Sequence, residues 1–145
     1  MEKIDPTQLS PLVLAYVGDA VYELYVRLIM VMNKPAAKSR SLHKASTSLV
    51  RATSQAETLK EIMPLLTAEE LEQVRRARNC QVNHITRGAT RAEYQASTAF
   101  EALIGFLYLS NQQERLIQIL TSCASSEAPV EYPRFGSPAP PADPE

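Results

Sequence analysis

The sequence is poor in the residues that build aromatic cores and disulfide-stapled domains. It contains no tryptophan, three phenylalanines and two cysteines in 145 residues, so most of its core must be aliphatic. Cys80 and Cys123 are far apart and lack the spacing of a zinc site, which excludes a disulfide framework and a zinc finger. Reduced thiols are typical of cytosolic proteins, and we therefore predict a cytoplasmic location.

The sequence also lacks an excess of positive charge. Fifteen Lys and Arg face sixteen Asp and Glu, which excludes a globally basic nucleic-acid binder but leaves room for a local basic patch. The long apolar run from 12 to 29 carries Asp19, Glu23 and Arg27 at four-residue steps. Three charges on one face are costly inside a bilayer, so we expect a buried helix and no contact with a membrane.

Helical patterns are present instead, and strand patterns are almost absent, so we predict an all-α fold. Expected helices cover residues 11–32, 39–63, 67–79, 90–111 and 112–124, with capping boxes from Thr67 to Glu70 and from Thr90 to Glu93. In the 39–63 helix, Leu42, Ala45, Leu49, Ala52 and Ala56 are expected to form the buried stripe. Residues 1–124 form one predicted domain, and the Pro-rich segment 125–145 is predicted to be a disordered tail.

Acidic residues interrupt both long apolar helices. Asp19 and Glu23 are one turn apart and share a face of the first, while Glu101 stands alone in the second. Carboxylates from two packed helices can hold Mg²⁺, which prefers oxygen ligands and activates water. The alternative is that each acid pairs with a basic residue such as Arg27 or Lys44 and only stabilises the bundle. Spacing alone leaves both interpretations open.

Five arginines and no acid lie between positions 75 and 91. Arginine clusters suit phosphate backbones, where contacts position a nucleic acid without reading its sequence. The alternative is a solvated surface that complements a helix C-terminus, which accounts for the first three arginines but not for the last two. The candidate phosphate contacts are Arg75, Arg76, Arg78, Arg87 and, from the 39–63 helix, Lys44.

Several of these segments together resemble one known family. "YVGDAVYELYV" and "STAFEALIGFLYL" are similar to the two signature helices of the ribonuclease III catalytic domain. "LHKASTSLVRATSQAETL" and "RRARN" resemble its short branch, Mini-ribonuclease III, which lacks a double-stranded-RNA-binding domain. The resemblance covers roughly residues 8 to 122. It implies an all-α, homodimeric, Mg²⁺-dependent endoribonuclease that cuts double-stranded RNA.

The resemblance also assigns residues. Asp19 and Glu101 fall on the catalytic, metal-binding pair, and Glu23 falls on a supporting acid of the signature motif. Two acids of full-length ribonuclease III are replaced here by Ala15 and Thr98, so water or substrate oxygens must complete the metal shell, with Thr98 in a supporting place. Tyr16 falls where the family forms its dimer interface.

The resemblance further implies a reaction and a substrate. Hydrolysis would leave 5′-phosphate and 3′-hydroxyl ends, and the substrate would be a precursor of large-subunit (23S) ribosomal RNA, with a ribosomal protein as a candidate second partner. RNA helices are recognised by shape, phosphates and 2′-hydroxyls, which suits an arginine surface. Because Ala15 and Thr98 replace acids, a non-catalytic RNA- or ribosome-binding dimer is the alternative function.

Overall fold

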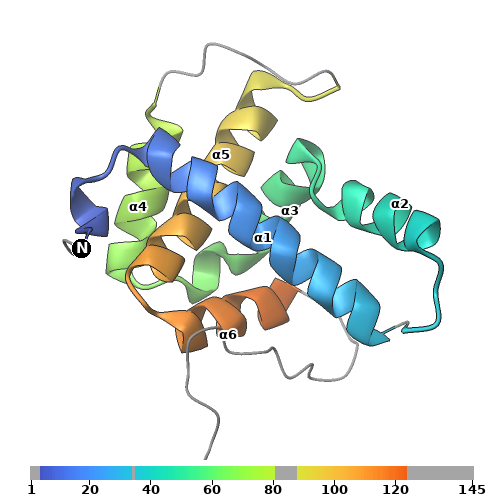
Figure 1. Cartoon of the computed structure of the whole chain (residues 1–145). Coiled ribbons are helices and arrows are strands. Elements are labelled where there is room, and N and C mark those ends of the chain that lie inside the picture. The colour runs from blue at the N-terminus through green and yellow to red at the C-terminus, as the bar shows by residue number, and fades with distance from the viewer. Residues whose placement is uncertain (1–3, 34, 81–87, 124–145) are drawn as a thin grey trace, which may run out of the picture.

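The computed structural model describes residues 4–33, 35–80 and 88–123 (Figure 1). These ranges contain only helices and connecting turns, so the all-α prediction is confirmed. No helix among them is long and apolar enough to cross a membrane. The elements in chain order are η1 Pro6–Gln8, α1 Pro11–Asn33, α2 Ser39–Leu49, α3 Ala52–Ile62, η2 Met63–Leu65, α4 Ala68–Arg78, α5 Arg91–Leu109 and α6 Gln113–Cys123. The predicted tail and its boundary at residue 124 lie outside the described residues.

Helix starts follow the capping chemistry of the sequence. Thr67 and Glu70 form the predicted capping box of α4, and Thr90 and Glu93 form that of α5. In each box the threonine hydroxyl accepts from a backbone amide of the first turn, and the glutamate carboxylate accepts from the threonine amide. These contacts satisfy amide donors that have no partner inside the helix.

The prediction of a single helix over 39–63 is wrong. The chain leaves helical geometry after Leu49 and is extended at Arg51 (φ −64°, ψ 147°), so α2 and α3 are separate helices. Ser54 Oγ donates to the Ser48 carbonyl across the junction at 2.9 Å, an alternative to the helical hydrogen-bond ladder that serine readily offers. After the bend, α3 packs against α5, whereas α2 packs mainly against α1.

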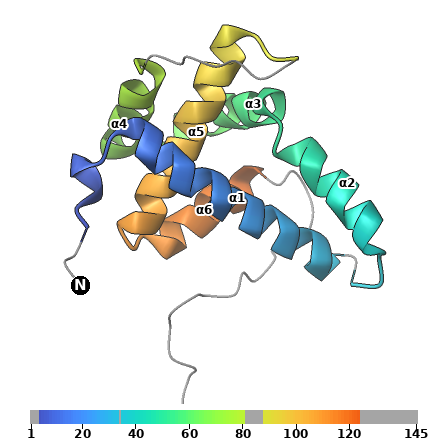
Figure 2. The ribbon, with the colours of Figure 1, turned by 45° about the horizontal axis from the view of Figure 1, so that its top comes forward.

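The predicted stripe of the 39–63 helix is wrong for the same reason. Leu49 is 41% exposed, because α2 lies at the edge of the molecule and packs mainly on α1 (Figure 2). After the bend, the buried positions of α3 are Gln55, Leu59 and Ile62, which follow their own helical period.

Helix α5 is the centre of the fold. It packs against α1, α3, α4 and α6, and α1 crosses it in both ribbon views (Figures 1 and 2). Tyr22 of α1 and Phe100 of α5 meet edge to face, with ring centroids 4.9 Å apart. Every residue from Ser97 to Leu107 is buried except Glu101, which is partly exposed. The fold therefore carries one carboxyl group in the middle of its most buried segment.

Candidate active site

Helices α1 and α5 cross with their backbones in direct contact. A Cβ atom on Gly18 would lie 1.7 Å from the carbonyl oxygen of Glu101, and one on Gly105 would lie 2.0 Å from that of Leu14. Only glycine permits such an approach. Because Gly18 touches the backbone of Glu101, the crossing brings Asp19, the next residue of α1, close to the Glu101 side chain.

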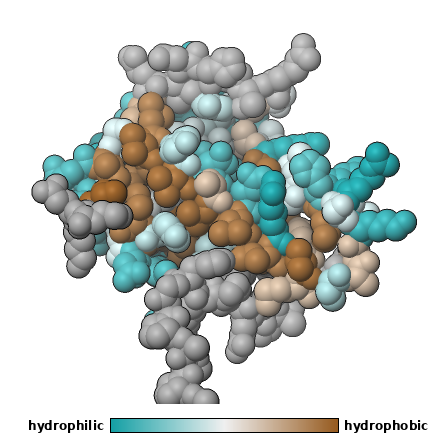
Figure 3. All heavy atoms as spheres, viewed as in Figure 1, coloured by the Kyte–Doolittle hydropathy of each residue, from teal (hydrophilic) through white to brown (hydrophobic). Residues whose placement is uncertain are grey.

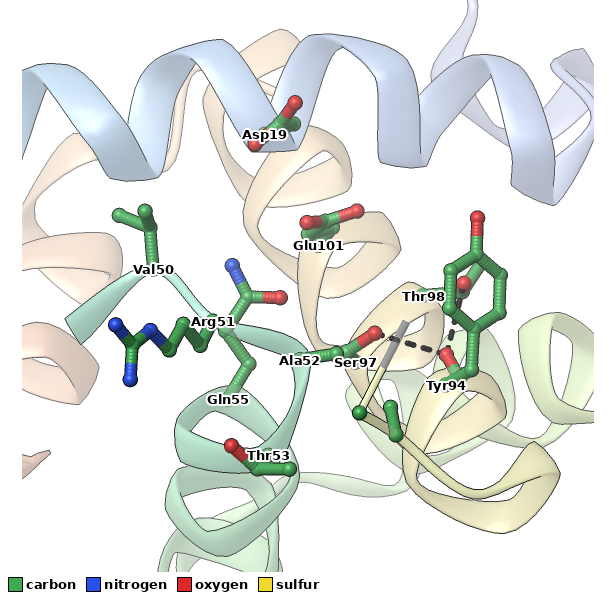
Figure 4. A pocket seen from close by; sticks show the side chains of 12 residues that line it. Asp19, Val50, Arg51, Ala52, Thr53, Gln55, Tyr94, Ser97, Thr98 and Glu101 are labelled. Atoms are coloured by element: carbon green, nitrogen blue, oxygen red, sulfur yellow. Dashed lines mark hydrogen bonds between the residues drawn. The ribbon is translucent and has the colours of Figure 1, made fainter. Parts of the chain in front are cut away.

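Asp19 and Glu101 line the same pocket, which has a volume of about 540 Å³ (Figure 4). Asp19 comes from α1 and Glu101 from α5, and the junction of α2 and α3 forms the facing wall. The remaining wall residues are Val50, Arg51, Ala52, Thr53, Gln55, Gly88, Ala89, Tyr94, Ser97 and Thr98. The structure thus brings together the two acids that the resemblance assigned as a pair.

The two carboxyl groups differ in their environments. Burial raises the pKa of Glu101 to about 7, with the negative charge of Asp19 as a second cause and the Gln55 side chain as a smaller opposing one. Burial also raises the pKa of Asp19, with the charge of Glu23 as a second cause. Neither acid forms an ion pair with a described residue. Among the described residues the pair therefore has no compensating positive charge, which favours a cation.

Glu23 lies outside this pocket. It is ion-paired with Arg27 one turn further along α1, and both side chains are largely solvent-exposed. Within the described ranges, the structural alternative, in which an acid pairs with a nearby base, thus describes Glu23 but neither Asp19 nor Glu101. Glu23 acts on the site at longer range, by raising the pKa of Asp19.

The residues around the acid pair fit a magnesium ion. Among the described residues no third Asp, Glu, His or Cys joins the pair. Ala15 is buried, and the Thr98 hydroxyl donates to the Tyr94 carbonyl at 3.0 Å. Mg²⁺ commonly binds through one or two carboxylates and keeps several waters or phosphate oxygens, so two carboxylates in an open pocket are a sufficient protein contribution.

Among the polar residues of the pocket that sequence reasoning missed are Gln55 and Arg51. Both belong to the segment predicted as part of one long helix. The bend between α2 and α3 places both in the pocket wall, with Gln55 directed toward the acids and the Arg51 guanidinium group directed away from them (Figure 4). No sequence signal identified them. Gly18 and Gly105 were missed as well, although an isolated glycine inside an apolar helix indicates close packing.

The predicted phosphate contacts are distributed over two surfaces. At the end of α4, Arg75 forms two hydrogen bonds with the Glu72 carboxylate, at 2.6 and 2.8 Å. Arg76 donates to the Leu9 carbonyl and to Gln73, so both guanidinium groups have partners within the chain. Arg78 on α4 and Lys44 on α2 are exposed. Arg87 lies outside the described residues.

Tyr16 is 82% exposed on the outer face of α1. Leu12 and Leu24 stand four residues before and eight residues after it, and both are exposed on the same face. Figure 3 shows a band of hydrophobic residues along this helix. Such a contiguous apolar surface is typical of a protein–protein interface.

Comparison with known proteins gives one consistent result. Residues 12–112 match the Ribonuclease III domain family. A Mini-ribonuclease 3 from Symbiobacterium thermophilum is 44% identical over 124 residues, which cover 86% of this chain and 95% of the relative. A Mini-ribonuclease 3 from a Thermoanaerobacter species is 47% identical over 112 residues, 77% of this chain and 78% of the relative.

A crystal structure of a protein from Fusobacterium nucleatum has the same fold. It superposes with a TM-score of 0.76 and 29% sequence identity, over 87% of this chain and all of the other. The match to the domain family spans both α1 and α5, the two helices that supply the acids. The chain therefore belongs to the ribonuclease III family, in its Mini-ribonuclease 3 branch.

Proposed function

We propose that this protein is a Mg²⁺-dependent endoribonuclease that cleaves double-stranded RNA. The observation that carries the proposal is the Asp19–Glu101 pair, two carboxyl groups without a basic partner among the described residues, in an open pocket of a ribonuclease III fold. Membership of that family makes endoribonuclease activity the expected class of chemistry.

Asp19 and Glu101 would hold the cation between α1 and α5. When bound there, Mg²⁺ supplies an activated water and neutralises negative charge that develops on the phosphoryl group. The packed backbones of the two helices fix the separation of the carboxylates, because the Gly18 and Gly105 contacts leave little room for relative sliding. The Thr98 hydroxyl, held by the Tyr94 carbonyl, supports the α5 wall of the pocket. Cleavage would leave 5′-phosphate and 3′-hydroxyl ends.

A basic surface on α2 would guide the RNA to this pocket. Lys44 and Arg40 are one turn apart and exposed, and Arg51 follows at the pocket wall. None of the three is ion-paired with a described residue, and Figure 3 shows hydrophilic residues over α2. The arginines at the end of α4, Arg75, Arg76 and Arg78, and Arg87 of the following segment, complete the proposed contacts. Phosphate contacts of this kind recognise the shape of an RNA helix rather than its sequence.

The protein would act as a homodimer through the exposed face of α1. Tyr16 lies within this apolar face, which a second copy would cover. Asp19 belongs to the acid pocket and also lines a shallower depression together with Tyr16 and Leu24. Dimerisation would thus set the two acid pockets at a fixed separation, so that one dimer could cut both strands of a duplex.

The proposed natural substrate is a precursor of 23S ribosomal RNA in the cytoplasm, with a ribosomal protein as a candidate second partner. This assignment rests on the relationship to the Mini-ribonuclease 3 proteins. It agrees with a domain that has a basic surface but no base-reading module among its described residues.

One assay tests the proposed activity. A duplex RNA labelled at one 5′ end is incubated with the protein in Mg²⁺, and in parallel with a chelator, and binding is measured on the same RNA by gel shift. We expect cleavage in Mg²⁺ only, with products that carry 5′-phosphate ends. Binding without cleavage in Mg²⁺ would instead support a non-catalytic RNA-binding dimer, the function favoured by the replacement of two acids with Ala15 and Thr98.

A further inference from the structure

Gln55 occupies a position where an apolar side chain would be expected. It is 1% exposed and shares the buried stripe of α3 with Leu59 and Ile62, four and seven residues further on. A buried amide costs stability unless its hydrogen-bonding groups find partners. Packing alone therefore does not explain a glutamine at this position.

Its amide nitrogen has no hydrogen-bond partner in the described part of the chain, which distinguishes it from the other buried polar side chains there. Nε2 of Gln55 is the buried side-chain atom that stays unsatisfied among the described residues. The hydroxyl groups of Ser46, Ser97 and Thr98 each donate to a backbone carbonyl of the preceding turn. Glu70 binds Arg115 at 2.6 Å, and Gln73 accepts from Arg76 at 3.2 Å. The unsatisfied donor is thus a local feature of the acid pocket.

The Gln55 amide points toward the two acids. It lines the same pocket as Asp19 and Glu101, and Figure 4 shows its end group directed from α3 toward the two acids, with the amide oxygen on the side of Glu101 and the nitrogen on the side of α1. The side chain is close enough to favour the ionised form of Glu101, although Nε2 does not reach hydrogen-bond geometry in the cation-free site. In this pocket the carboxylates of Asp19 and Glu101 are strong acceptors for such a donor.

We propose that Gln55 is a positioning residue for Glu101, whose buried amide nitrogen donates to the Glu101 carboxylate when that group binds a cation and so fixes which oxygen faces the cation. The inference rests on the proposed function. Hydrogen bonds from a neighbouring side chain commonly orient the ligands of a metal and raise its affinity. Here the amide would serve a site in which two family acids are replaced, at Ala15 and Thr98.

The test compares the wild type with Gln55→Met, which keeps the length of the side chain and removes the amide. In the metal-free protein, Gln55→Met should raise the melting temperature by about 2 to 6 °C, because it removes a buried unsatisfied donor. In a calorimetric titration with Mg²⁺ alone, it should weaken binding by about tenfold or more. A purely structural glutamine would give the reverse pattern, with lower stability and unchanged Mg²⁺ affinity, and that result would overturn the proposal.

Gln73→Met is the matched control, since Gln73 is a buried glutamine on α4 whose oxygen already accepts a hydrogen bond. It should lower the melting temperature and leave Mg²⁺ affinity unchanged.

Gln55→Glu separates donation from direct ligation: loss of the donor should weaken Mg²⁺ binding, whereas tighter binding would show that position 55 acts as a ligand and would overturn the proposal. If wild type and Gln55→Met bind Mg²⁺ equally, Gln55 has no such function while the proposed activity stands. If the wild type binds no Mg²⁺, both proposals fail.

Discussion

Glu101 is a carboxyl group held where an aliphatic side chain would pack more stably. Its neighbours from Ser97 to Leu107 are all buried, and burial raises its pKa to about 7. In the metal-free protein, ionisation of Glu101 therefore costs free energy, and a bound cation would offset that cost. Such a cost in the centre of the core is typical of a functional residue, because selection for packing alone would remove it.

This cost has a measurable pH dependence. The folded protein keeps the Glu101 proton up to about pH 7, whereas the unfolded chain releases it near pH 4.5. Stability should thus fall as the pH rises from 4.5 through 7, because the folded state must ionise a buried carboxyl group beside Asp19. Glu101→Gln, which mimics the neutral form, should match the wild type at pH 5 and exceed it at pH 8 by about 1–3 kcal/mol.

Chemical denaturation at pH 5 and pH 8, in the presence of a chelator, measures this difference in the free energy of unfolding. A variant that is less stable than the wild type at pH 8 would show that the Glu101 charge is compensated in the folded protein.

Arg51 is the basic residue of the pocket wall, and Arg75 is a matched comparison because it is also exposed but is bonded to Glu72. Arg51→Ala should weaken binding of duplex RNA by about fivefold to tenfold and reduce its salt dependence, because one phosphate contact is lost. Arg75→Ala should have a smaller effect, since its guanidinium group already has a partner. Gel shifts at two salt concentrations measure the RNA affinity of both variants. A larger loss of affinity for Arg75→Ala would show that the RNA contacts α4 rather than the pocket wall at Arg51.

At the scale of elements, the crossing of α1 and α5 makes the site. The two acidic helices were evident from the pattern, but spacing alone left open whether each acid pairs with a base. The resemblance carried by "GDAVYE" and the segment around Glu101 predicted the acid pair. The bend after Leu49 was not predictable from periodicity, because residues 39–63 contain no glycine or proline and the hydroxyl groups that break the helix are also common within helices. For that reason Gln55 and Arg51, which reach the pocket only through the bend, were missed.

The helix crossing itself can be tested at Gly18. In an isolated helix, alanine is more favourable than glycine by about 1 kcal/mol. At Gly18 its Cβ would overlap the Glu101 carbonyl at 1.7 Å, so Gly18→Ala should instead destabilise the protein by about 3 kcal/mol or more and lower Mg²⁺ affinity.

Ala20→Gly is the control, at an exposed position of the same helix, and it should cost about 1 kcal/mol. Urea denaturation of both variants gives the comparison. A neutral or stabilising Gly18→Ala would mean that the two helices are not in backbone contact.

At the scale of the whole molecule, the single chain leaves an apolar face of α1 uncovered (Figure 3). Because the chain belongs to the ribonuclease III family, we propose that a second copy of the chain covers this face. The sequence placed Tyr16 there through the resemblance, whereas the exposure of Leu12 and Leu24 follows from the way α1 lies across α5.

Leu24→Glu should convert the proposed dimer to a monomer without unfolding the chain. A charge buried within an apolar interface is left without a partner, which typically costs several kcal/mol of association energy. Leu65→Glu is the matched control, because Leu65 is an exposed leucine in η2, away from α1. Sedimentation velocity measures both. A wild-type protein that sediments as a monomer, or a Leu24→Glu variant that remains dimeric, would remove α1 as the interface.

The central claim is that Asp19 and Glu101 of one chain together hold the cation that cuts RNA. The most direct measurement is single-turnover cleavage of a duplex RNA at saturating Mg²⁺ by the wild type, Asp19→Asn and Glu101→Gln, with RNA binding and melting temperature recorded for each. Both variants should fold and bind RNA while cleaving it at least about a hundredfold more slowly. Cleavage within a few-fold of the wild-type rate in either variant would contradict the assigned site.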